Sequence, residues 1–219
     1  MATAFRLSSG VFLSALDSNA KHIADEFEAK LAELPHSIPV TRSDAIGRHG
    51  GPTWAESGVA NILISTSPRP QLEARAHRMS RIDGSVTVPI IIDHPFVRFG
   101  PMADGIGGCS ECLRVRLKQH GLSDDFERMR ISAFGDQHGG PNLLLPHETE
   151  HLFARALAVL EQLEHGNYSH DPGRVIWFDL MNISSTSGTV SGIHGCSICG
   201  GQAGSPETRT WKYLAEREV

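Results

Sequence analysis

Short apolar runs alternate with amphipathic segments along the first half of the chain. Residues 10–16, 59–65 and 85–93 are mainly apolar, which is the pattern of strands that are buried on both faces of a sheet. Residues 20–34 and 70–83 instead place apolar side chains three and four positions apart, which predicts amphipathic helices. This alternating order predicts an α/β fold in which helices flank a largely parallel sheet through right-handed crossovers.

The second half of the chain continues with strands and helices of less regular spacing. The expected elements are a strand at 94–102, a short helix at 111–122, a long helix at 148–166, and a closing pair of strands at 174–184 and 187–194. The helix at 20–34 has defined ends in the sequence, because Asp17 is a suitable cap before it and Pro35 stops it.

All four cysteines of the chain stand in two Cys-x-x-Cys pairs, Cys109 with Cys112 and Cys196 with Cys199. Glycines flank each pair and permit the tight backbone path of a metal-binding knuckle. A structural zinc ion takes four ligands in a tetrahedron, commonly thiolates. Two pairs with no cysteine left over therefore predict one shared Zn(2+), which would join a mid-chain loop to the C-terminal segment.

A closed site of four thiolates leaves no open coordination position, so the expected zinc is structural and not catalytic. Two alternatives remain, namely two local redox pairs and a disulfide between the knuckles. The N-terminal segment has Arg6 as its one early positive charge, and Ser and Gly interrupt its apolar part, so a first strand is favoured over a signal peptide. A cytoplasmic location is the default, and its reducing conditions favour thiolates over disulfides.

Composition limits the classes of partner. The 219 residues are ample for one domain with a hydrophobic core, and the hydrophobic fraction of 40% is that of a globular protein. A net charge of −5 argues against nucleic acid and against an anionic membrane surface as partners. The sequence also has no apolar stretch of membrane-spanning length.

A second metal motif, H-E-x-x-H, is formed by His147, Glu148 and His151. In zinc peptidases two such histidines bind the metal from one helical face and the glutamate is the general base. Here Pro146 and the acidic residues suit the first turn of a helix, and the charged Glu150 lies between the glutamate and the second histidine. A helix start is favoured, and a metalloprotease is the less favoured alternative.

The sequence around the knuckles resembles the ThiF/MoeB-type, ubiquitin-activating-enzyme-like family. Members of that family have a Rossmann-like α/β domain and a structural zinc held by two Cys-x-x-Cys pairs. The resemblance covers about residues 10–201 and is closest to the ThiF-like partner subunit of thiazole/oxazole-modified peptide cyclodehydratases. The matching positions are Gly100-Pro101, Gly107, Cys109, Cys112-Leu113, Cys196 and Cys199-Gly200.

The resemblance implies a subunit role in ribosomal peptide natural product biosynthesis. In that branch the ThiF-like protein recruits the precursor peptide, and a separate YcaO protein spends ATP to cyclise Cys, Ser or Thr side chains. Activating enzymes of the family bind ATP at a Gly-rich turn after the first strand, but residues 15–22 lack G-x-G-x-x-G. With every cysteine assigned to metal, none remains for a thioester. The expected protein is non-catalytic, without a nucleotide cofactor, and part of a homo- or hetero-oligomer.

Two further expectations concern organisation. Partner proteins of that branch usually begin with a winged-helix-like domain that binds the leader peptide by strand addition. Here the α/β sheet is expected to start directly, which favours a shortened scaffold subunit. We expect one ThiF-like domain over residues 1–201 and a C-terminal tail over residues 202–219, in which Trp211, Tyr213 and Leu214 are candidate partner contacts. The runner-up function is a stand-alone adenylating or sulfur-transfer enzyme with an unusual ATP loop.

Overall fold

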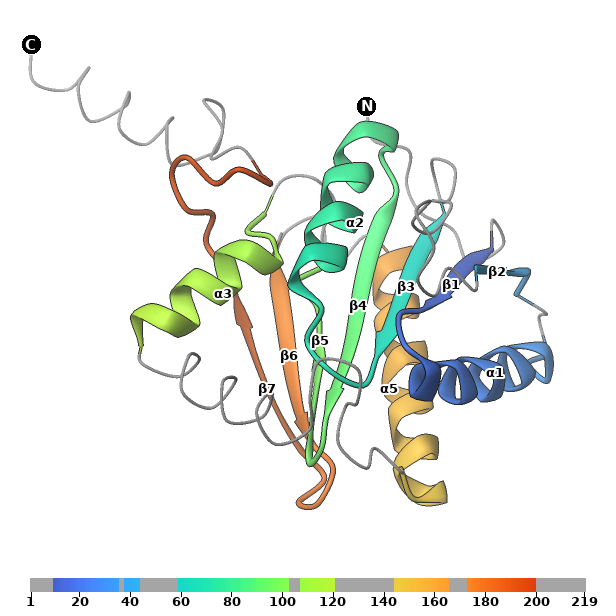
Figure 1. The fold of residues 1–219 in the computed structure, drawn as a ribbon. Helices are drawn as coiled ribbons and strands as arrows, with labels where there is room; N and C mark the ends of the chain where they lie inside the picture. The colour runs from blue at the N-terminus through green and yellow to red at the C-terminus, as the bar shows by residue number, and fades with distance from the viewer. Residues whose placement is uncertain are drawn as a thin grey trace, which may run out of the picture.

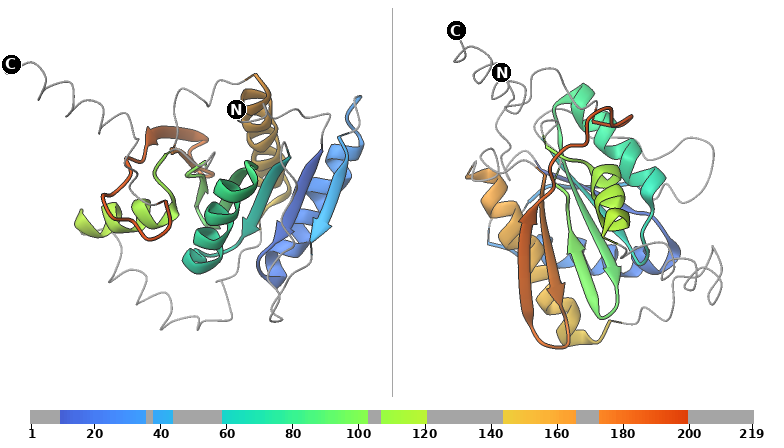
Figure 2. Two further views of the ribbon diagram at one scale, coloured as in Figure 1. Left: turned by 90° about the horizontal axis from the view of Figure 1, so that it is seen from above. Right: turned by 90° about the vertical axis from the view of Figure 1, so that its left-hand side faces the viewer.

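A central sheet with helices on both faces forms the part of the protein that the structure describes (Figures 1 and 2). The structure is a computed structural model. It describes residues 10–35, 38–43, 59–102, 107–120, 144–165 and 173–199. The predicted tail at 202–219, with Trp211, Tyr213 and Leu214, lies outside the described residues.

The described sheet has seven strands in the order β2-β1-β3-β4-β5-β6-β7. The strands are β1 Val11–Ala15, β2 Val40–Ser43, β3 Ala60–Ser65, β4 Val86–Asp93, β5 Phe96–Phe99, β6 Arg174–Asp179 and β7 Ser184–Thr189. The pairings among β1, β2, β3 and β4 are parallel, and those from β4 through β7 are antiparallel. The α/β class is confirmed: β1 is joined to its parallel neighbour β2 through α1, and β3 to β4 through α2. The antiparallel half, β4 through β7, departs from the largely parallel sheet that the sequence predicted.

Four described helices cover the two faces of the sheet. They are α1 Ser18–Ala32, α2 Pro70–Asp83, α3 Ser110–Gln119 and α5 Pro146–Glu164. Helices α1 and α5 share the main core, where the rings of Phe27 and Phe153 meet edge to face at 5.4 Å. Helices α2 and α3 lie against each other on the opposite face from α5 (Figure 2). None of the described helices has the length and hydropathy needed to cross a membrane.

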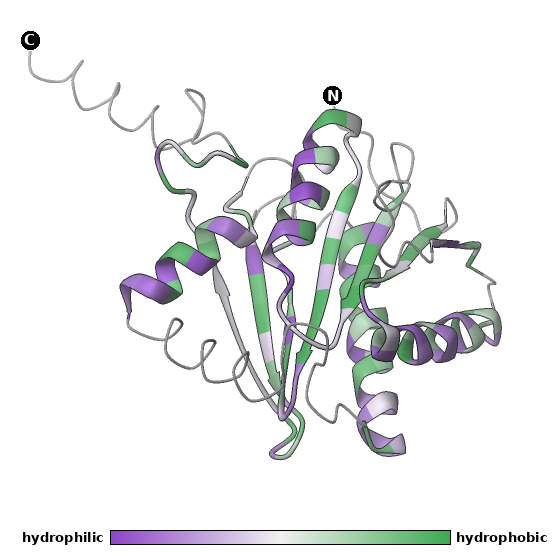
Figure 3. Cartoon of the chain, viewed as in Figure 1, coloured by the Kyte–Doolittle hydropathy of each residue, from purple (hydrophilic) through white to green (hydrophobic). Residues whose placement is uncertain are grey.

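Two edge strands differ from the sequence prediction. Strand β2 was not predicted, because it has only four residues and no apolar run. Strand β7 begins at Ser184, whereas a strand over 187–194 was expected. Figure 3 shows why: β3 and β4 are mainly hydrophobic, but β7 consists of small polar residues, all exposed, so its position leaves no hydrophobic pattern.

Candidate metal centre

The antiparallel half of the sheet brings the two cysteine pairs together. The first pair follows β5, and the second pair follows β7. On the way to the first pair, the Met102 N–H donates to the Arg174 carbonyl at 2.9 Å and the Gly108 N–H donates to the Val190 carbonyl at 3.1 Å. The Val190 N–H in turn donates to the Gly173 carbonyl at 2.9 Å. The segment that leads to Cys109 is thus hydrogen-bonded to the start of β6 and to Val190, the residue after β7. The chain after Val190 leads on to Cys196.

Glycine is required beside each knuckle for a different reason. A Cβ on Gly108 would lie 2.3 Å from the Val190 carbonyl oxygen, which is too close for any side chain. Gly195 has open space around it but a φ of +75°, a conformation that L side chains rarely adopt. Gly108 therefore permits the close approach of the two segments, and Gly195 permits the turn into Cys196.

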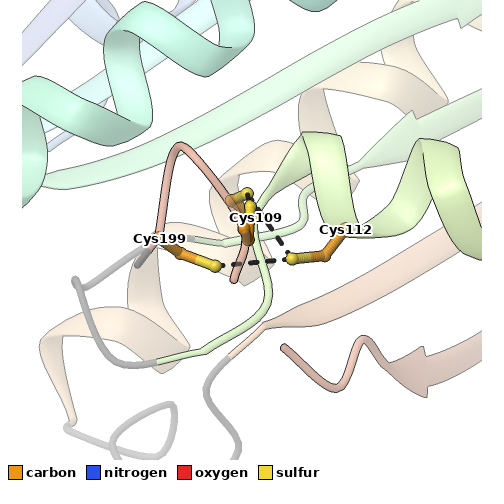
Figure 4. A group of neighbouring side chains, drawn as sticks. Cys109, Cys112 and Cys199 are labelled. Atoms are coloured by element: carbon orange, nitrogen blue, oxygen red, sulfur yellow. Dashed lines mark hydrogen bonds between the residues drawn. The ribbon is translucent and has the colours of Figure 1, made fainter. Parts of the chain in front are cut away.

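The four sulfur atoms form one compact cluster, the only group of three or more possible metal-ligating side chains among the described residues. All four lie within 4.8 Å of one another. The Sγ–Sγ distances are 3.8 Å for Cys109–Cys112 and 3.4 Å for Cys112–Cys199 (Figure 4). The Sγ–Sγ distance for Cys109–Cys196 is 3.6 Å. A tetrahedral ion with bonds of about 2.3 Å needs sulfurs about 3.8 Å apart, whereas a disulfide needs about 2.05 Å. The cluster therefore fits a tetrahedral metal ion and no disulfide.

Hydrogen bonds make the sulfurs of Cys109 and Cys112 unequal. The thiol of Cys109 and the backbone N–H of Ile193, 3.3 Å away, both donate to Cys112 Sγ, and they lower the pKa of Cys112. The pKa of Cys109 is raised, because its proton is held by Cys112 and because burial disfavours the charged form. A bound cation would stabilise all four thiolates, and the Ile193 N–H would remain as a donor to sulfur.

An apolar shell surrounds the cluster. Cys109 and Cys112 are buried, and Cys196 and Cys199 are half-buried. Leu113, Val175 and Val190 pack against them, with partly buried Trp177, Ile193 and Ile198 outside. A shell of this kind keeps water and competing ligands from the sulfurs, which suits a structural ion held by four thiolates.

The carboxylate of Asp17 occupies the turn after β1. It accepts hydrogen bonds from the Ala20 N–H at 2.8 Å, the Thr66 N–H at 2.9 Å, and the hydroxyls of Ser65 and Thr66, both at 2.8 Å. The strand order reverses between β1 and β3, the point at which open α/β sheets bind ligands. In this protein a carboxylate of the chain itself takes the place at the α1 N-terminus where an anion would bind.

The H-E-x-x-H residues start helix α5. Pro146 stands in its first turn, and Glu148 is buried with one oxygen accepting from the Leu145 N–H at 2.7 Å and the other 3.1 Å from His94 Nε2. Burial would raise the pKa of Glu148, but the hydrogen bonds from Leu145 and His94 outweigh it and lower that pKa. His147 is exposed. The glutamate is therefore committed to capping the helix, as the favoured sequence interpretation has it.

One buried polar group near the metal centre was not predicted. It consists of Glu73 and His77 on α2, Arg98 on β5, and Ser110 between the first two cysteines, and every member is buried. Arg98 Nη2 lies 2.9 Å from Glu73 Oε2, and His77 Nε2 lies 3.3 Å from Ser110 Oγ. The sequence carries no motif for it, because the four residues come from three separate segments that meet only in the fold.

Comparisons with known proteins find similarity in structure alone. No known family model matches the sequence, and no curated protein matches it. The fold is similar to the heterocyclase TruD, with 14% identity and a TM-score of 0.62 over 95% of this chain and 32% of that one. It is also similar to a chain of the E. coli microcin synthetase McbBCD complex, with 12% identity and a TM-score of 0.65 over 87% of this chain and 69% of that one.

A third similar structure is E. coli MccB, with 13% identity and a TM-score of 0.52 over 89% of this chain and 66% of that one. The chain spans 32% of the length of TruD and 25% of the length of a second heterocyclase, solved in complex with substrate and cofactor. At these identities the likeness concerns the fold alone.

Proposed function

We propose that the chain is a non-catalytic, ThiF-like subunit of an azoline-forming heterocyclase complex. In this complex it would recruit the precursor peptide and hold it for a YcaO-type subunit that performs the ATP-dependent cyclisation. The observation that carries the proposal is the fold likeness to heterocyclases and to a chain of a microcin synthetase complex. The expected location is the cytoplasm.

The metal part of the proposal assigns one Zn(2+) to Cys109, Cys112, Cys196 and Cys199. The Sγ–Sγ distances of 3.4, 3.6 and 3.8 Å and the apolar shell support a closed tetrahedral site. When bound, the ion would supply structural crosslinking between the segment after β5 and the segment after β7. The chain's own residues contribute the four thiolates and the Ile193 N–H that stabilises Cys112.

The non-catalytic part of the proposal is supported by Asp17. An adenylating enzyme needs the α1 N-terminus for nucleotide phosphate, and a carboxylate already bound there would repel that phosphate. To bind ATP at this turn, the protein would have to break all the hydrogen bonds of Asp17. A stand-alone adenylating enzyme is accordingly the weaker alternative.

A partner is supported by exposed apolar side chains at one end of the sheet. Phe96, Leu145, Met181 and Ile183 are between 47% and 72% exposed. Their segments are joined, since the Leu180 N–H donates to the Pro95 carbonyl at 2.9 Å and Glu148 bridges His94 and Leu145. Apolar side chains gathered at one end are typical of contact surfaces between proteins.

Reconstitution tests the proposed function. A YcaO-type protein and a candidate precursor peptide, sought among the genes that flank this one, would be purified with this chain, mixed with ATP, and analysed by mass spectrometry for loss of one water per azoline. We expect cyclisation to need this chain and to proceed without any ATP turnover by this chain alone. Cyclisation at an equal rate without it would contradict the subunit role, and pyrophosphate exchange by the isolated chain would favour the adenylating enzyme.

A further inference from the structure

Helix α2 contacts both halves of the cysteine cluster. His77 lies beside Ser110, which directly follows Cys109. One helical turn further along, Arg81 Nη1 donates a hydrogen bond to the carbonyl oxygen of Ile198 at 3.3 Å. Ser110 is the first of the two residues between Cys109 and Cys112, and Ile198 is the second of the two residues between Cys196 and Cys199. The same helix thus contacts a side chain of one knuckle and the backbone of the other.

The protonation state of His77 decides which atom is the donor in its hydrogen bond with Ser110. Burial lowers the pKa of His77 to about 4, so the ring is neutral at pH 7 and carries one N–H. Nδ1 has no hydrogen-bond partner, and an unpaired lone pair is less costly than an unpaired buried N–H. We therefore assign the proton to Nε2, which donates to Ser110 Oγ, while the Ser110 hydroxyl donates to the Glu73 carboxylate.

The far end of this chain of hydrogen bonds is fixed to the sheet. Burial would raise the pKa of Glu73, but the charge and hydrogen bond of Arg98 outweigh it and lower that pKa. Arg98 lies on β5, where it also donates to the carbonyl of Gly100, at the start of the segment that leads to the first knuckle. Ser110 is therefore connected through buried groups to the sheet as well as to α2, and its position relative to the sheet is defined.

We propose that α2 is a platform that positions both knuckles for the metal, with His77 and Arg81 as positioning residues. The direction of each Sγ in a Cys-x-x-Cys loop depends on the backbone of the two residues between the cysteines. By fixing Ser110 and Ile198, the two side chains bring the sulfurs together before the ion binds, which lowers the cost of ordering the loops. This inference rests on the proposed zinc occupancy.

The rate of zinc release tests the platform. The purified full chain would be mixed with excess 4-(2-pyridylazo)resorcinol at pH 7.5 (about one unit above the ordinary histidine pKa), and the coloured complex followed with time. His77→Ala and Arg81→Ala should each release zinc about 10-fold faster, as loss of a residue that orients metal ligands does elsewhere. His77→Gln should restore much of the wild-type rate, because the glutamine amide can donate to Ser110 from the place of Nε2.

Two control variants separate positioning from general destabilisation. Arg78→Ala removes an exposed arginine from the same helix, and Ile90→Val removes one buried methyl group from the main core and so destabilises the fold away from the cysteines. Neither should change the release rate. Wild-type rates in both His77→Ala and Arg81→Ala, or equal acceleration in the controls, would overturn the platform.

If His77→Ala does not fold, the half-buried Arg81 decides the matter. Arg81→Ala should then accelerate release, and Arg81→Lys should restore part of the wild-type rate, since lysine keeps a donor near Ile198. A wild-type rate in Arg81→Ala would overturn the platform. Purified wild-type protein without any metal would instead contradict the metal site itself, and the positioning role would then fail with it.

Discussion

Replacing Asp17 by alanine tests how much its carboxylate, in the turn after β1, contributes to the free energy of unfolding. Asp17 caps α1 and joins the ends of β1 and β3 through four hydrogen bonds. Loss of an N-cap costs about 1 kcal/mol. The two bonds from Thr66 and the bond from Ser65 are made to a carboxylate, and each is worth about 1.5 kcal/mol before water replaces it. Because Asp17 is only half-buried, we expect water to recover part of this and the total loss to be about 3 kcal/mol.

Urea denaturation followed by circular dichroism measures this loss. Asp25→Ala is the matched control, because Asp25 is an aspartate of the same helix that is 54% exposed and pairs with Arg42 at 2.9 Å. Such a surface pair contributes no more than about 1 kcal/mol. The free energy of unfolding of Asp17→Asn should lie between those of Asp17→Ala and Asp25→Ala, because the asparagine amide keeps one acceptor oxygen. A free energy of unfolding for Asp17→Ala within about 0.5 kcal/mol of that for Asp25→Ala would refute the role assigned to the carboxylate.

The remaining predictions concern metal, helix start, pH and nucleotide. Cys109→Ser and Cys196→Ser should each lose zinc and much of the folded protein, because structural zinc binding is coupled to folding; elemental analysis and circular dichroism measure both. Glu148→Ala should lower the free energy of unfolding by about 1 kcal/mol through the lost cap, whereas His147→Ala should keep both stability and zinc; metal loss on His147→Ala would favour the peptidase. Since folding lowers the pKa of His77 to about 4, the unfolded chain takes up a proton first as pH falls below about 6.5. Stability should therefore drop between pH 6.5 and 4, and urea titrations of His77→Gln should lack this part of the drop. Calorimetry should show no ATP binding to the isolated chain. A clear binding isotherm would contradict the interpretation that Asp17 occupies the place of a nucleotide phosphate.

The parts of the fold that sequence predicts best are those whose side chains are buried in a regular pattern. Strands β3 and β4 are apolar along nearly their whole length because both of their faces are covered, so the run is visible without a structure. The start of α1 was equally visible, since Asp17 is the N-cap. The sequence could assign the two cysteine pairs to one cluster, because the Cys-x-x-Cys spacing suits the coordination geometry of a metal ion whatever the surrounding fold.

Other features leave no trace in sequence, for physical reasons. Strand β7 has no buried side chain, and its position follows from its register with β6, which the sequence does not state. The network of Glu73, His77, Arg98 and Ser110 depends on side chains from separate segments, each of which looks like an ordinary surface residue on its own. Asp17 could be identified as a cap, but its bonds to Ser65 and Thr66 require β3 to lie beside β1.

The two ends of the sheet carry different groups, Asp17 at one end and the cysteine cluster at the other. This difference supports a scaffold role. Strands β1, β3 and β4 end at the edge where Asp17 fills the ligand position, while β5 and β7 run antiparallel to β4 and β6 and end at the opposite edge, beside the cysteines (Figure 1). Under the proposed function, the cysteine end is the one that a metal would stabilise, and Asp17 occupies the end at which open α/β sheets bind ligands. Under the proposed function, such an arrangement would give the chain rigidity without requiring it to carry a reactive site. Rigidity is what a subunit needs if its task is to hold a peptide in place for another protein to modify.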